Sequence, residues 1–104
     1  MSLIGNFEDI PDNSTSSIMV DQRSLLLVKR AGDLFIYDNR CPHTGESLDP
    51  MGGSVASDDG LLIQCQRHAA EFVSTTGECV AGPCQGEQLE IVPFTLSGGD
   101  VYLD

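Results

Sequence analysis

Two short clusters in the chain combine thiol and imidazole side chains: Cys41-Pro42-His43 and Cys65-Gln66-Arg67-His68. The chain has only two histidines, and both are in these clusters, together with two of its four cysteines. Thiolate and imidazole groups are ligands of soft and borderline metal ions. A C-x-H … C-x-x-H arrangement of four such groups therefore predicts a metal centre held by these two cysteines and two histidines.

The order of the ligands favours a two-iron centre over a zinc site. Finger-type zinc sites pair like ligands, as C-x₂₋₄-C followed by H-x₃₋₅-H. Here each cluster mixes one cysteine with one histidine. This mixture suits a centre in which one iron takes both cysteines and the other takes both histidines. A zinc-stabilised binding module remains an alternative on ligand type alone.

The segments around the two clusters predict an all-β domain, an antiparallel sandwich or partly open barrel. Short runs rich in β-branched and aromatic residues alternate with turn residues, and no stretch has a sustained helical period with caps. The expected strands are 18–21, 24–29, 34–37, 61–64, 71–74, 79–80, 89–96 and 101–103. The spacings favour antiparallel pairing through turns at 21–24, 31–33, 75–78 and 97–100.

Other segments are expected to be irregular. Residues 12–17 are the least structured stretch by composition, and residues 39–60 form a long loop that carries the first cluster. Loops of this length in compact domains are usually functional. Pro93 is expected to place its strand at an edge or a bulge, because proline cannot donate to a ladder.

Composition limits the classes of partner. A chain of 104 residues is expected to form one domain, residues 1–104. Its 16 acidic and five basic residues give a net charge of −11, which argues against nucleic acid and anionic membrane as partners and favours a basic protein surface. No apolar run approaches the roughly 20 residues of a membrane span. The N-terminus has no basic region of a secretory signal, so we expect a cytoplasmic protein with reduced thiols.

The two clusters and their surroundings resemble the Rieske [2Fe–2S] family. Further matching segments are 44–48, 71–72, 76–78 and 82–83, so the resemblance covers roughly residues 20–104. It implies one [2Fe–2S] cluster per chain, held by loops near 41–48 and 65–70. Cys41 and Cys65 would bind the inner iron, and His43 and His68 would bind the outer, more exposed iron.

Four other positions are similar to the low-potential branch of that family. High-potential members have a serine and a tyrosine two and four places after the second histidine, and a disulfide between the loops. Here the corresponding positions are Ala70 and Phe72, and Glu46 and Arg67. Fewer hydrogen bonds to the cluster sulfurs favour the oxidised state. The chain is thus similar to the soluble ferredoxins of bacterial ring-hydroxylating oxygenases.

The resemblance implies a function in electron transfer. One electron would arrive from a flavin-dependent reductase and leave to an oxygenase-type acceptor. A small Rieske-fold accessory subunit of a nitrite reductase-like enzyme is an alternative, although many such subunits lack the four ligands. An oxygenase active site needs a mononuclear iron on two histidines and a carboxylate. Since both histidines are committed to the cluster, we expect no enzymatic turnover by this chain alone.

The remaining thiols, Cys79 and Cys84, match neither the ligands nor the disulfide of the high-potential members. A local disulfide between them is one possibility, and free buried thiols are the favoured interpretation in a reducing compartment. The chain also departs from the family at Ala69, where glycine is usual, and in a longer segment at 50–60.

Overall fold

Three small antiparallel sheets make up the computed structural model of the chain. The model describes residues 2–40, 48, 54–57, 61–65, 70–82 and 86–103. In these ranges the regular elements are nine strands and one short 3₁₀ helix, η1 (Phe7–Asp9). The prediction of an all-β antiparallel fold is confirmed. Across the same ranges, no helix is long and apolar enough to cross a membrane.

The middle sheet is a meander of β2 (Ser14–Val20), β3 (Arg23–Arg30) and β4 (Asp33–Asp38). Two-residue turns join the strands, at Asp21-Gln22 and Ala31-Gly32, and all four of these residues have positive φ. Such turns match the right-handed twist of paired strands. Both turns were predicted.

One prediction about the middle sheet is wrong. Residues 14–17 were expected to be unstructured, but they form the first half of β2 and pair with residues 26–29 of β3. Four successive serine and threonine side chains hide the strand in the sequence. On this edge strand Ser17 faces solvent, while Thr15 is buried and its hydroxyl accepts from the amide of Val55.

The middle sheet separates two hydrophobic cores, because successive side chains of a strand point to opposite faces. On β3, Leu26 and Val28 enter the first core, while Leu25 and Leu27 enter the second. This arrangement explains why β3 is buried continuously from Leu25 to Lys29. The first core also contains Tyr37, Leu48, Val55, Ile63, Cys65, Ala70, Phe72, Cys79 and Leu89. The second core also contains Leu34, Ile36, Val92 and Val101.

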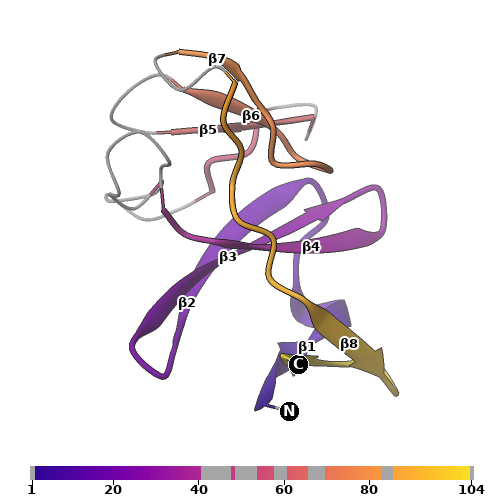
Figure 1. Cartoon of the computed structure of the whole chain (residues 1–104). Coiled ribbons are helices and arrows are strands. Elements are labelled where there is room, and N and C mark those ends of the chain that lie inside the picture. The colour runs from indigo at the N-terminus through magenta and orange to yellow at the C-terminus, as the bar shows by residue number, and fades with distance from the viewer. Residues whose placement is uncertain are drawn as a thin grey trace.

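A second sheet, of order β5-β6-β7, packs over the first core. Its strands are β5 (Leu62–Gln64), β6 (Glu71–Val73) and β7 (Cys79–Ala81). All three lie within or beside segments that were predicted as strands. Figure 1 shows this sheet at the opposite end of the molecule from the two termini.

The third sheet joins the two ends of the chain. β1 (Ser2–Asn6) pairs with β9 (Asp100–Leu103), which pairs with β8 (Phe94–Ser97) in the predicted terminal hairpin. β1 was not predicted, because it is short and its partner lies almost a whole chain length away. In Figure 1 the N and C labels lie beside each other at this sheet.

The connector of residues 86–93 was expected to contain the first half of a strand, and that part of the prediction is wrong. It makes isolated contacts instead: the amide of Leu89 donates to Gly77 O, that of Asp38 to Glu90 O, and that of Val92 to Ile36 O. Figure 1 shows the connector passing β4 on its way to β8. Pro93 comes directly before β8, which is an edge strand as expected.

Candidate metal centre

Cys65 is the predicted ligand that the structure describes, and it follows directly after β5. Along β5 the side chains alternate between buried and exposed, so Ile63 and Cys65 both face the first core while Gln64 faces outward. Cys65 is 6% exposed and forms no disulfide. A shielded thiol at the end of a rigid strand fits a ligand to the inner iron of a two-iron cluster.

The second loop is the connection between β5 and β6, and a backbone bond closes it. Gln64 pairs with Glu71 in the ladder, and their side chains also meet, with Nε2 of Gln64 3.2 Å from Oε2 of Glu71. One step further, the amide of Cys65 donates to Ala70 O at 2.9 Å. Residues 66–69 lie between these points, and they include His68, which is outside the described residues.

The first loop begins after β4 and returns to the first core at Leu48. Cys41 and His43 lie outside the described residues, as do Glu46 and Arg67. Leu48 is fully buried in the first core, which also contains Cys65. Its amide donates to Oδ1 of Asn39 at 3.0 Å. The structure thus places Leu48, five residues after His43, in the same core as Cys65, the predicted ligand of the second cluster.

The two positions that lack a hydroxyl are both fully buried. Ala70 and Phe72 have no exposed surface and pack in the first core with Cys65. Neither side chain can donate a hydrogen bond to a cluster sulfur. The two apolar residues predicted to stand in place of hydroxyl donors therefore lie in the protein interior, next to the second loop, and not on the surface.

The remaining cysteines are only partly described. Cys79 is buried in β7, and its thiol donates to Ala81 O at 3.2 Å. Cys84 lies outside the described residues, so a disulfide between the two stays a prediction. Within the described ranges, no group of three or more His, Cys, Asp or Glu side chains could hold a metal ion. Both histidines are outside those ranges, so the ligand set of Cys41, His43, Cys65 and His68 also stays a prediction.

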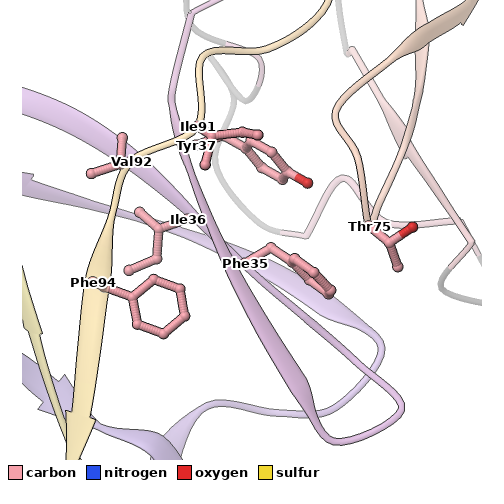
Figure 2. Close-up of a pocket in the computed structure, with 7 residues that line it drawn as sticks. All are labelled: Phe35, Ile36, Tyr37, Thr75, Ile91, Val92 and Phe94. Carbon is pink, nitrogen blue, oxygen red and sulfur yellow. The ribbon is translucent and has the colours of Figure 1, made fainter.

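A small apolar pocket borders Tyr37. It has a volume of about 70 Å³ and is lined by Phe35, Ile36, Tyr37, Thr75, Ile91, Val92 and Phe94. Figure 2 shows Phe35 and Tyr37 pointing to one side of β4 and Ile36 to the other. The Tyr37 hydroxyl donates to Ser74 O at 2.8 Å, and burial raises the pKa of Tyr37 to about 12. The pocket contains none of the predicted ligands, and its tyrosine hydroxyl is already bonded to the backbone.

Sequence reasoning missed Asn39 as a member of the site. The residue was assigned only to the start of the long loop, yet its side chain is buried and bonded to Ser24 of β3 and to the amide of Leu48 beyond the first cluster. A polar side chain two residues before the predicted ligand Cys41, directly after a strand, is the signal that could have identified it.

The chain matches the family model for the Rieske [2Fe–2S] domain over residues 1–95. It is 34% identical over 73 residues to the "p-cumate 2,3-dioxygenase system, ferredoxin component" of Pseudomonas putida, which covers 70% of this chain and 58% of that protein. The chain thus spans less than two thirds of that relative. It is 27% identical over 97 residues to the "3-phenylpropionate/cinnamic acid dioxygenase ferredoxin subunit" of Shigella flexneri, covering 92% of this chain and 85% of that protein.

Among solved structures, the fold is similar to a chain of the "Complex of reduced oxygenase and oxidized ferredoxin in carbazole 1,9a-dioxygenase". The TM-score is 0.79 at 20% identity, covering 97% of this chain and 89% of that chain. This likeness supports the three-sheet architecture, while the family match covers both candidate ligand clusters. The chain belongs to the Rieske [2Fe–2S] domain family, and its cofactor is the cluster of that family.

Proposed function

We propose that the chain is the electron carrier of a multicomponent oxygenase system. It takes one electron from a flavin-dependent reductase and delivers it to an oxygenase. The observation that carries this proposal is the family match over residues 1–95 together with a complete C-x-H … C-x-x-H set. The names of the relatives support an oxygenase as the acceptor, because both are ferredoxin parts of dioxygenase systems.

The ligands we propose are Cys41 and Cys65 for the inner iron and His43 and His68 for the outer iron. The cluster supplies a site that holds one electron. The chain contributes a buried thiol at Cys65 and apolar side chains beside it. Hydrogen bonds to the sulfurs raise the reduction potential of such clusters, and the side chains of Ala70 and Phe72 cannot donate any. We therefore expect a reduction potential in the low part of the Rieske range of about −150 to +300 mV.

We propose that the chain acts as a single domain over residues 1–104 in the cytoplasm and has no turnover of its own. Both histidines are used by the cluster, so a second, catalytic iron on two histidines would have no imidazole ligand. The partners are then proteins rather than small substrates. Ten of the 16 acidic residues but only one of the five basic residues follow residue 40. This asymmetry suits encounter between the cluster-bearing half of the chain and basic partner surfaces.

The first test is the metal content and the spectrum of the protein purified without oxygen. Two irons and two sulfides per chain are expected, with the electron paramagnetic resonance (EPR) signal of a histidine-ligated [2Fe–2S] centre after reduction. Stoichiometric zinc without iron would instead support a zinc-stabilised binding module and contradict electron transfer.

The second test separates ligands from other cysteines. Cys65→Ser should lose the cluster or shift its spectrum strongly. Cys79→Ser is the matched control, because Cys79 is also a buried cysteine of the first core but is not a proposed ligand. It should keep the native signal. His68→Cys should lower the potential or lose the cluster, and an unchanged spectrum would remove His68 from the ligand set.

A further inference from the structure

Asn39 has a buried side chain whose two polar atoms are both used. The residue is 6% exposed and comes directly after β4, two positions before Cys41. Its Nδ2 donates to Oγ of Ser24 at 3.1 Å, and its Oδ1 accepts from the amide of Leu48 at 3.0 Å. A carboxamide is one of the few side chains that can donate and accept in two directions at once.

The bond from Leu48 joins the two ends of the segment that carries the first cluster, and the bond to Ser24 ties residue 39 to β3. The backbone amide of Asn39 also donates to Ser24 O at 3.0 Å, so residue 39 is fixed to β3. Leu48 is fixed in the first core, where Cys65 also lies. The side chain of Asn39 thus links β3 of the middle sheet to Leu48 in the first core.

The two ligand loops are closed in different ways. The second is closed by the backbone bond from Cys65 to Ala70, which almost any sequence at these positions could make. The bond that joins the flanks of the first, from Leu48 to Asn39, uses a side chain. The bond between the flanks of the first loop therefore depends on which residue stands at position 39, whereas the bond between the flanks of the second uses backbone atoms alone.

We propose that Asn39 is a positioning residue for the cluster, which holds the Cys41 and His43 side of the ligand set in place against Cys65. This inference rests on the proposed ligand set. If Oδ1 is removed, the amide of Leu48 is buried without an acceptor, and such a group is costly in the folded state. The segment would then relax away from the core, and the cluster would lose the fixed spacing of its two loops.

Three variants test the proposal on the cluster-loaded protein. Asn39→Leu keeps the approximate shape and removes both bonds. Asn39→Asp keeps an acceptor for the Leu48 amide and another for the Ser24 hydroxyl, which can donate. Tyr37→Phe is the matched control, because it deletes one buried side-chain-to-backbone bond in the same core without touching the flanks of the first loop. The readouts are cluster loss in an iron chelator, EPR g-values and reduction potential, beside the melting temperature.

We expect Asn39→Leu to lose its cluster about tenfold faster than the wild type, the factor for leaving the buried Leu48 amide without an acceptor, and to show altered g-values. Asn39→Asp should stay within about threefold of the wild type, while Tyr37→Phe should melt earlier with native g-values and potential. Native cluster retention and g-values in Asn39→Leu would overturn the proposal, as would equal changes in Tyr37→Phe.

If Asn39→Leu does not fold, Ser24→Ala carries the same test. It removes the partner of Nδ2 and leaves residue 39 in place, so cluster loss should be about threefold faster, and an unchanged rate counts against the proposal. A wild-type protein that lacks a [2Fe–2S] signal would contradict the proposed function itself. The two failures are therefore distinguishable.

Discussion

Of the glycines whose surroundings the structure describes, Gly77 is the one at which an added methyl group would meet neighbouring atoms most closely. It follows β6 with φ of +76°, and its backbone is held on both sides, since its amide donates to Val73 O at 2.7 Å and its carbonyl accepts from Leu89. A Cβ at this residue would lie 2.9 Å from Cε1 of Tyr37 and 3.2 Å from Cβ of Leu89. Neither neighbour can move easily, because both are buried in the first core.

The cost of Gly77→Ala has two parts that a matched control separates. Positive φ costs an L-residue roughly 1–2 kcal/mol, partly offset by the lower entropy of the unfolded chain. Gly32→Ala has the same backbone penalty, with φ of +82°, but its Cβ would meet nothing within 4 Å. We expect a loss of about 1 kcal/mol for Gly32→Ala. Overpacking against Tyr37 adds about 1–3 kcal/mol, so Gly77→Ala should lose about 2–4 kcal/mol.

The assay is thermal unfolding of the cluster-loaded proteins without oxygen, followed by circular dichroism at one scan rate. At roughly 4 °C per kcal/mol for a domain of this size, Gly77→Ala should melt about 8–16 °C below the wild type and Gly32→Ala about 4 °C below it. Equal shifts in the two variants would refute the steric argument. A small shift in both would show that neither turn needs its glycine.

Three further predictions concern other described groups. Lys29→Met removes charged hydrogen bonds to Phe7 O (3.2 Å) and Ile10 O (3.1 Å) and the cation–π contact with the Phe7 ring. The free energy of unfolding should fall by about 2–3 kcal/mol, and hydrogen exchange in residues 2–10 should become faster. Unchanged exchange would contradict the idea that Lys29 holds this segment. Burial raises the pKa of Tyr37 from 10.0 to about 12. The stability that the neutral phenol contributes is therefore fully present below about pH 10 and is lost as the pH rises through about 12. The alkaline unfolding curve of Tyr37→Phe should lack this loss, and identical curves for the variant and the wild type would contradict the prediction. Electron transfer to cytochrome c, a basic acceptor, should slow as the salt concentration rises from about 0.01 to 0.5 M, because salt screens the attraction of the acidic chain. A rate that does not change with salt would show that the acidity does not guide encounter with a basic partner.

Much of the fold could be predicted because its signals are local. The hairpins of the middle sheet are marked by β-branched runs and by turn residues, and the structure contains both hairpins. The three short strands around the second cluster were also found. What the sequence could not show are partners far away in the chain. β1 pairs with β9 across almost the whole length, and the connector of residues 86–93 makes its bonds one at a time.

The ligand types of the site could be predicted from the sequence, but the hydrogen bonds of Asn39 beside it could not. Ligand types and spacing are read directly from the chain, so the family could be named from them. The role of Asn39 depends on Ser24 and Leu48 coming together, which are 15 and nine positions away. A side chain that satisfies two distant groups has no periodic signal, and only the folded geometry reveals it.

The low-potential interpretation gains a physical basis from the burial of Ala70 and Phe72. A missing hydroxyl on the surface would matter little, because water could donate to the same acceptor. Both positions are instead fully buried in the core that contains Cys65, so these side chains are shielded from solvent. Added negative charge on a reduced cluster is then less stabilised from this side. Because potential follows the hydrogen bonds and the exposure of the sulfurs, we expect a cluster bound beside these two residues to favour the oxidised state and to release its electron readily.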